Sequence, residues 1–304
     1  MNKITLKEIK TTVEKSGYLM EQELLPRIER FGYFVTPNHN FMDQDTGISR
    51  EIDIHAIGGQ QISRGKFDFI FPVILTECKN NETPFIFFTH DYIFKGILSL
   101  NDALISGLPK EIEDKNKELI SLCDFLKMYK FHHHAQIERI STQFCKITRN
   151  GQRLEANQEM VYDKIVVPLI KAVDSEIKNH FKPKEVISEE EEINLQIYYP
   201  LIILSGQLYE WYIRKGRNHL RPVKHVVFLR NYETRMIKGE FKIDVITKDY
   251  LNTYLKIIDR EIFQIKQRIK RNVKRLRNEV RRECRVILEK RKNRINKPYQ
   301  FKLK

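Results

Sequence analysis

The sequence predicts an α/β protein, on three observations about where its apolar side chains lie. A helical segment and three strand-like segments occupy the first 90 residues, and strand-like segments return between residues 191 and 248. Residues 249–304 repeat apolar side chains at the spacing of a helix. The chain has 304 residues, of which 41% are hydrophobic, so it is long enough for one large domain or two ordinary ones with a real core.

The amino-terminal part of the chain predicts one helix followed by three strands. In the helical segment Thr5–Phe31, apolar side chains recur three and four residues apart, and Gly32 follows as a stop signal. Strands are expected at Tyr33–Phe41, Arg50–Ile57 and Phe67–Lys79, where β-branched and aromatic residues alternate with turn-forming sequences. We therefore expect a helix that is followed directly by a small sheet.

The remainder of the chain is predicted to divide into three parts. Residues 91–190 are expected to form a mostly helical insertion, in which Pro168 kinks a helix or marks its first turn. Residues 191–248 are expected to supply later strands that complete the sheet. Residues 249–304 are expected to form one long basic amphipathic helix.

The predicted carboxy-terminal helix combines an apolar stripe with a large positive charge. Its apolar residues lie on average 3.6 residues apart, which is the period of a straight α-helix. They are Leu251, Leu255, Ile258, Ile262, Ile265, Ile269, Val273, Leu276, Val280, Cys284 and Ile287. Residues 260–304 contain 18 Lys or Arg and 4 Asp or Glu, and so carry the whole net charge of +14. A basic segment of this kind indicates a polyanionic partner, either nucleic acid or an acidic membrane surface.

Composition argues against several classes of protein. The four cysteines are widely spaced and form no CxxC pair, which argues against a disulfide framework and a structural zinc site and indicates reduced thiols in a cytoplasmic protein. No secretory h-region is apparent at the amino terminus, and no apolar run reaches the roughly 20 residues of a membrane helix. Neither GxxxxGK[ST] nor GxGxxG occurs, so we expect no nucleotide cofactor.

The strand that ends at Lys79 carries two charges where burial is expected. Glu77 and Lys79 follow a nearly continuous apolar run, and alternation along a strand puts them on one face. A charge pair at the end of such a strand is costly unless water or a ligand reaches it. The Glu-x-Lys spacing occurs elsewhere in the chain, but only this pair ends a long apolar strand.

Two further carboxylates are expected beside this pair. Asp53 lies on the preceding strand, and pairing of the two strands would bring it next to Glu77 and Lys79. Glu21 shares the helix face of Leu24, Leu25 and Ile28, whereas Glu23 aligns with the solvent face. Carboxylates that converge on one point repel each other unless a hard cation lies between them, and Mg²⁺ is the usual choice.

The order of these residues resembles the PD-(D/E)XK nuclease superfamily, which has a restriction-endonuclease-like or Holliday-junction-resolvase-like fold. Its pattern, an acid on a helix and then strands that carry Asp and (Asp/Glu)-x-Lys, matches Glu21 in "GYLMEQEL", Asp53 in "REIDIHA", and Glu77 and Lys79 in "VILTECK". Ile52 stands where the literal motif has Pro. The resemblance covers about the first 90 residues and implies a nuclease core there, in a mixed central sheet flanked by helices.

The resemblance implies a metal-dependent endonuclease that hydrolyses phosphodiester bonds of DNA, with RNA not excluded. Asp53 and Glu77 would bind Mg²⁺, with Mn²⁺ a plausible substitute; Glu21 would complete the acidic cluster, and Lys79 would orient or help to deprotonate water. The basic helix would contact the phosphates of DNA through seven Lys and Arg side chains. They are Lys270, Arg271, Lys274, Arg275, Arg277, Arg281 and Arg282. A homo-oligomer or a protein partner is also possible.

Other interpretations of these segments stay open. The fold can be a catalytically inactive one that binds nucleic acid or assembles with a partner, and the acidic cluster can be an ordinary ladder of surface ion pairs. The carboxy-terminal helix can lie on a membrane surface, although the stripe is narrow and lacks aromatic anchors beyond Phe263. We expect the triple His132–His134 to be polar surface, because consecutive side chains point in different directions on a helix or strand.

Overall fold

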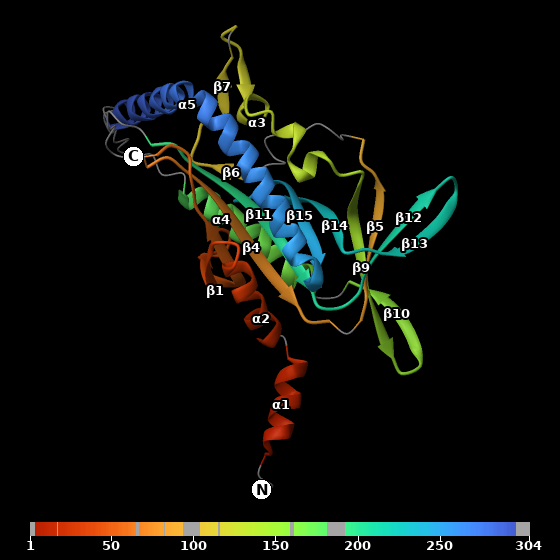
Figure 1. Ribbon diagram of the computed structural model, residues 1–304. Coiled ribbons are helices and arrows are strands. Elements are labelled where there is room, and N and C mark those ends of the chain that lie inside the picture. Colours follow the sequence, from red (N-terminus) through yellow and green to blue (C-terminus); the bar gives the residue numbers. More distant parts are fainter. Residues whose placement is uncertain are drawn as a thin grey trace, which may run out of the picture.

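The computed structural model describes residues 4–16, 18–64, 67–81, 83–93, 104–114, 116–158, 161–180 and 192–295, without the side chains of 15, 180, 284 and 286–295. Over these residues the protein is a mixed α/β structure with one large mixed sheet, helices on both faces and a long carboxy-terminal helix (Figure 1).

The amino-terminal segment forms two helices where the sequence predicted one. Helix α1 (Leu6–Lys15) begins with a capping box, in which the Thr5 hydroxyl accepts from the Glu8 N–H and the Glu8 carboxylate accepts from the Thr5 N–H at 2.8 Å. Helix α2 (Tyr18–Glu29) ends just before Gly32, whose φ of +83° suits glycine. The predicted stop at Gly32 is therefore confirmed.

Within the described residues, thirteen strands join in one sheet. They are β1 (Tyr33–Met42), β2 (Ser49–Gly58), β3 (Gln60–Gln61), β4 (Phe69–Lys79), β5 (Phe85–Asp91), β6 (Leu104–Ser106), β9 (Arg139–Asn150), β10 (Arg153–Asn157), β11 (Asn194–Leu204), β12 (Leu208–Arg214), β13 (Arg217–Pro222), β14 (His225–Glu233) and β15 (Lys238–Thr247). The main path runs β1-β2-β4-β11-β15-β14-β9-β5-β12-β13. Strands β7 (Glu111–Glu113) and β8 (Leu119–Ser121) form a separate pair.

The centre of the sheet is parallel and its first edge is antiparallel. Strand β11 pairs in parallel with β4 over its whole length and with β15 on its other side. Strands β1, β2 and β4 form an antiparallel meander. The strands predicted in the first 90 residues are thus confirmed, and strands from 191–248 join the same sheet.

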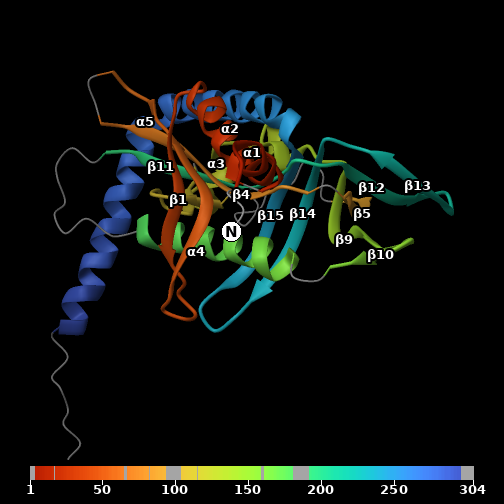
Figure 2. The same cartoon turned by 90° about the horizontal axis from the view of Figure 1, so that it is seen from below.

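The sheet separates two hydrophobic cores. Helices α2 and α5 (Leu251–Ile295) cover one face and α4 (Val167–His180) covers the other (Figure 2). Strand β11 serves both cores, because Tyr199 and Leu201 point to the face of α5 while Tyr198 and Ile202 point to the face of α4. A strand buried on both faces reads as a continuous apolar run, as β11 does.

The prediction that residues 91–190 are mostly helical is wrong. The described residues of this stretch contain five strands, β6 to β10. Their helices are short apart from α4. They are α3 (Leu122–Phe125), the 3₁₀ turns η1 (Met128–Lys130) and η2 (His133–Ala135), and the π-turn η3 (Tyr162–Val166) that leads into α4. The three-residue strands β6, β7 and β8 are too short for a periodic pattern, whereas β9 has 12 residues and was also not predicted. Pro168 directly follows the π-turn η3 in a helical stretch that is continuous from residue 161, and Pro and π-bulges are usual places for an irregularity in a helix.

Helix α5, which follows the 3₁₀ turn η4 (Lys248–Tyr250), confirms the predicted apolar stripe from Leu251 to Val280. The side chains of Cys284 and Ile287, and residues 296–304, lie outside the described residues. The stripe residues Leu255, Ile258 and Ile262 are at most 1% exposed and belong to the core beneath α5. Stability is therefore expected to depend on the stripe more than on the exposed residues of the same helix.

We expect Ile262→Ala to lower the free energy of unfolding by about 2–5 kcal/mol, because it opens a cavity under α5. Phe263→Ala is the matched control on the next residue, which is 53% exposed, and should change stability by less than about 0.5 kcal/mol. Urea unfolding followed by circular dichroism measures both. Equal effects of the two variants would contradict the packing of α5 described above.

Candidate functional site

The predicted carboxylates of β2 and β4 lie side by side. The antiparallel pairing of β2 with β4 ends at Ile54 and Thr76, which are the neighbours of Asp53 and Glu77 in the sequence. The Asp53 Oδ2 accepts a hydrogen bond of 2.6 Å from the backbone N–H of Cys78. This bond fixes the Asp53 side chain at the end of β4, directly beside the Glu-x-Lys segment.

Glu77 is a buried carboxylic acid that lies near three other acidic side chains. Its side chain is 7% exposed. Burial, together with the negative charges of Asp53, Glu21 and Glu51, raises the pKa of Glu77 to about 9, against the opposing effect of Lys79. One lysine therefore faces four carboxylates, and the surplus of negative charge keeps a proton on Glu77 at neutral pH.

Glu21 and Glu23 occupy different environments, as the helix pattern predicted. Glu21 is half-buried, and burial together with the charges of Asp53 and Glu51 raises its pKa to about 6. Glu23 is exposed and forms an ion pair with Lys248. Only Glu21 joins the cluster, which also contains Lys79 at the end of β4.

The acidic cluster is not a closed set of metal ligands. In the part of the chain that the structure describes, three groups of His, Asp or Glu have all their ligand atoms within 4.8 Å of one another, and none includes Glu21, Asp53 or Glu77. The four predicted residues therefore share one electrostatic neighbourhood, but three carboxylate oxygens do not yet meet at one point.

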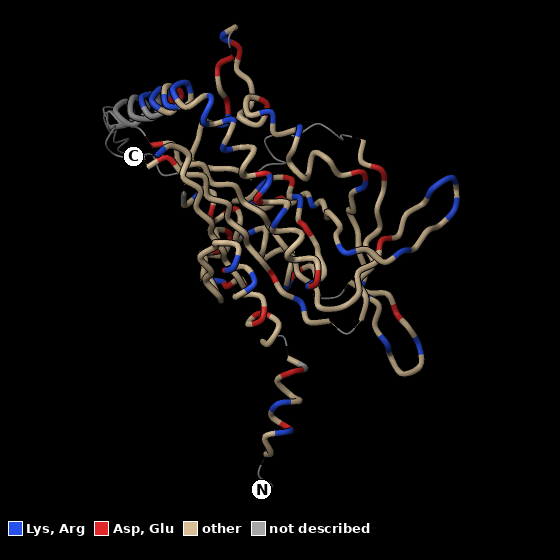
Figure 3. The backbone as a smooth tube through the Cα atoms, viewed as in Figure 1, with Lys and Arg blue, Asp and Glu red and all other residues tan. Residues whose placement is uncertain are grey.

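Lys and Arg positions follow one another along α5 (Figure 3). Contacts within the protein occupy part of this basic face. Arg277 forms an ion pair with Asp68 at 2.5 Å, and Arg282 pairs with Glu113. The guanidinium of Arg275 lies 4.8 Å from the ring centre of Phe125. Of the remaining predicted contact residues, Lys270, Arg271 and Lys274 are exposed.

The interpretation of His132–His134 as polar surface is wrong, because these residues are buried beneath α5. His132 is 2% and His134 is 4% exposed. The turn η2 brings the three rings together, with centres 4.1 to 5.2 Å apart, which neither a helix nor a strand would do. The signal in the sequence was the run of three consecutive histidines. The tight turn η2 brings their rings together in one cluster.

The three histidines surround two buried carboxylates, Asp244 on β15 and Glu261 on α5. His133 lies between them, with Nδ1 at 2.9 Å from Glu261 Oε2 and Nε2 at 3.0 Å from Asp244 Oδ2. Its backbone N–H also donates to Glu261. His133 thus connects helix α5 to strand β15.

Further donors surround each carboxylate. Asp244 accepts from Tyr254 Oη at 2.8 Å, and lies 3.1 Å from His134 Nε2 and 2.7 Å from His225 Nε2. Glu261 accepts from Tyr199 Oη at 2.7 Å, with His132 Nε2 at 3.3 Å. Four donors can therefore reach each carboxylate, which matches its capacity to accept.

The protonation of this network follows from its charges. Although burial opposes a charged ring, Asp244 and Glu261 raise the pKa of His133 to about 10, so the ring is an imidazolium with two donors. His132 Nδ1 accepts from the His134 N–H, so a neutral His132 donates through Nε2, and burial lowers its pKa to about 3. Two of the three groups with close ligand atoms belong to this network. Six of its contacts have distances of 2.7 to 3.1 Å, which are those of hydrogen bonds, so shared protons account for its geometry.

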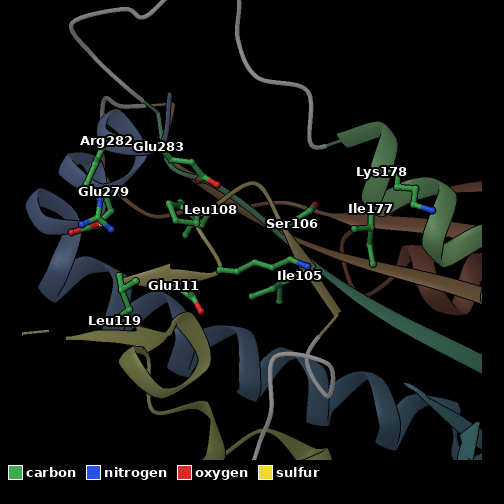
Figure 4. A pocket seen from close by; sticks show the side chains of 12 residues that line it. Ile105, Ser106, Leu108, Glu111, Leu119, Ile177, Lys178, Glu279, Arg282 and Glu283 are labelled. Atoms are coloured by element: carbon green, nitrogen blue, oxygen red, sulfur yellow. The ribbon is translucent and has the colours of Figure 1, made fainter. Parts of the chain in front are cut away.

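A cavity of about 840 Å³ lies apart from both clusters. Its lining combines apolar and charged side chains from β6, β7, α4 and α5, among them Leu108, Ile177, Glu111 and Arg282 (Figure 4). None of the four predicted catalytic residues lines it.

Comparison of the chain with protein-family models, with curated proteins and with solved structures finds no match. In the described residues, no helix is long and apolar enough to cross a membrane.

We expect the wild-type protein to lose stability as pH rises from about 6.5 to about 10. The pKa of His133 is higher in the folded than in the unfolded chain, so its contribution is complete below the unfolded value and disappears as pH rises through the folded one. His133→Gln should lower the unfolding free energy by about 3–5 kcal/mol at pH 6, because two buried carboxylates lose their cation. It should also reduce this pH dependence, and the part that remains comes from Glu77, whose pKa is likewise raised in the folded protein.

The matched control is His219→Gln on β13, whose ring stacks on Tyr212 away from the network. Urea unfolding from pH 6 to pH 10 measures all three proteins. An unchanged pH profile in His133→Gln would show that His133 is not the buried cation.

Proposed function

We propose that the protein is a metal-dependent phosphodiesterase that cleaves DNA. The observation that carries the proposal is the approach of Glu21, Asp53, Glu77 and Lys79 from α2, β2 and β4, in a cluster where four carboxylates face one lysine. Oxygen ligands with surplus negative charge fit a hard divalent cation, Mg²⁺ or Mn²⁺, and not a soft one. The resemblance to PD-(D/E)XK nucleases rests on the same four residues.

Each side chain has a defined part in this chemistry. Asp53 and Glu77 would hold the cation, and the Cys78 N–H keeps Asp53 oriented for that purpose. A bound divalent cation supplies charge for the scissile phosphate and a lower pKa for water. Lys79 orients water and offsets the charge that develops on the phosphate, and Glu21 completes the acidic cluster.

Helix α5 is the proposed phosphate-contacting element. Its exposed residues Lys270, Arg271 and Lys274 are available to the DNA backbone, whereas Arg275, Arg277 and Arg282 already contact the protein. Contacts of this kind set affinity and not sequence preference.

A second candidate function is binding of nucleic acid without cleavage, on the same fold. The specific observation in its favour is that the predicted carboxylates do not form a closed ligand set. Metal-dependent nicking of supercoiled plasmid separates the two functions, since only the first requires Asp53 and Lys79.

We expect Asp53→Ala and Lys79→Ala each to lower the rate of plasmid nicking with Mg²⁺ or Mn²⁺ by at least about 100-fold, because each removes a group that acts on the scissile phosphate. Nucleic-acid affinity, measured by electrophoretic mobility shift with EDTA present, should change little. Nicking by both variants at the wild-type rate would refute the site.

The two glutamates of α2 provide a matched pair within this experiment. Glu21→Gln should impair nicking strongly, whereas Glu23→Gln should not, because only Glu21 contributes charge to the cluster. The opposite result would mean that α2 presents the other face to the site.

We expect the replacement of Lys270, Arg271 and Lys274 by Gln to weaken DNA binding and to flatten its dependence on salt by roughly 2 to 3 in the slope of log affinity against log salt. This change keeps the buried stripe, which truncation of α5 would destroy. The matched control replaces three exposed lysines, Lys7, Lys10 and Lys110. Equal slopes for the two triple variants would remove α5 from the phosphate-contacting surface.

A further inference from the structure

Three potential metal ligands converge outside both clusters described above. They are His39 on β1, His55 on β2 and Glu176 on α4. His39 Nε2 lies 3.3 Å from Glu176 Oε1, and His55 Nε2 lies 3.9 Å from Glu176 Oε2. The three ligand atoms lie within 4.8 Å of one another.

The fold brings these residues together from distant parts of the sequence. Strands β1 and β2 pair in antiparallel register, with His39 opposite Ile52 and Thr36 opposite His55. Asn38, which precedes His39, has a φ of +50°, and the pairing of β1 with β2 continues in the same register on both sides of it. The rings of His39 and His55 then stack, with centres 4.3 Å apart and planes at 24°. Helix α4 crosses this edge of the sheet and supplies Glu176 (Figure 2).

The separations of the three ligand atoms are compatible with a shared cation. Ligands about 2.0–2.1 Å from a tetrahedral Zn²⁺ lie about 3.3–3.4 Å from each other. The distance of 3.3 Å from His39 to Glu176 matches this spacing and is also that of a long hydrogen bond. The distance of 3.9 Å from His55 to Glu176 is too long for a hydrogen bond, so a proton does not join His55 to this carboxylate.

The group is also reachable from solvent. The side chains of His39, His55 and Glu176 are 27%, 12% and 24% exposed. Two imidazoles and one carboxylate leave a fourth tetrahedral position that can face water, the pattern of catalytic and not of structural zinc sites.

We propose that His39, His55 and Glu176 form a Zn²⁺ site with one open coordination position. Its ligands are chemically distinct from the oxygen ligands of the proposed Mg²⁺ site, because imidazole favours Zn²⁺ over Mg²⁺. His55 and Asp53 lie two residues apart on β2, about 7 Å along the strand, so the two cations occupy separate positions. The proposal does not depend on the proposed nuclease function.

The test is titration of the full-length, chelator-treated protein with Zn²⁺ alone, by calorimetry and by metal analysis after gel filtration. We expect about one tightly bound Zn²⁺ per chain. His39→Ala, His55→Ala and Glu176→Gln should each weaken that binding by at least about 100-fold. Co²⁺ in place of Zn²⁺ should give the visible absorption of a tetrahedral site in the wild type and lose it in these variants.

Two controls keep the result specific. His219→Ala removes a histidine outside every close ligand group and should keep the Zn²⁺. Asp53→Asn should also keep it while it abolishes nicking with Mg²⁺, so the two sites can fail independently. Circular dichroism and thermal unfolding establish that each variant is folded.

Three results would overturn the proposal. One is absence of stoichiometric Zn²⁺ binding by the wild type. Another is equal stoichiometry and affinity in folded His39→Ala and His55→Ala proteins, which would place the cation elsewhere. The third is loss of Zn²⁺ in Asp53→Asn, which would assign it to the acidic cluster.

Discussion

The interaction on which the arrangement of this protein depends is the burial of Asp244 and Glu261 around His133. Asp244 belongs to the central strand β15, and Glu261 belongs to α5, so the imidazolium between them joins helix and sheet. Two carboxylates in a hydrophobic core are costly unless each is fully hydrogen-bonded and their charge is opposed. Tyr199 and Tyr254 contribute donors from β11 and α5 and thereby satisfy that condition. The same contacts determine where α5 lies, and with it the cover over one whole face of the sheet.

The acidic cluster at the ends of β2 and β4 shows the opposite electrostatic state. In the His133 network the protein supplies its own cation, so the carboxylates are ionised and their pKa values are lowered. Around Glu77 the protein supplies Lys79 alone against four carboxylates, and the pKa of Glu77 is raised. A carboxylate cluster with too little positive charge of its own is suited to bind a cation from solution. Oxygen ligands favour a hard cation. This contrast is the physical basis for placing the proposed chemistry at Glu77 and not at the histidines.

Strand β2 connects the two proposed cation positions. Asp53 belongs to the acidic cluster, and His55, two residues later, belongs to the group with His39 and Glu176. The strand also lies between β1, which carries His39, and β4, which carries Glu77 and Lys79. The first edge of the sheet, rather than its buried centre, therefore concentrates the candidate ligands. The edge position leaves His39, His55 and Glu176 partly accessible to water, whereas Glu77 on β4 is buried.

The sequence by itself determined the elements whose pattern is local and long. Strands β1, β2 and β4, helix α5 with its stripe, and the different environments of Glu21 and Glu23 all follow from periodicity over about ten residues or more. The approach of Asp53 to Glu77 was also predictable, because β2 and β4 are close in sequence and their pairing is antiparallel. Tertiary structure decided what depends on distant segments. The short strands of residues 91–190 gain their hydrogen bonds from partners elsewhere in the sheet, and His132–His134 become a cluster only where β15 and α5 bring Asp244 and Glu261 to them. His39 and Glu176 lie 137 residues apart and meet because α4 crosses the sheet at β1, a contact set by packing that no local pattern encodes.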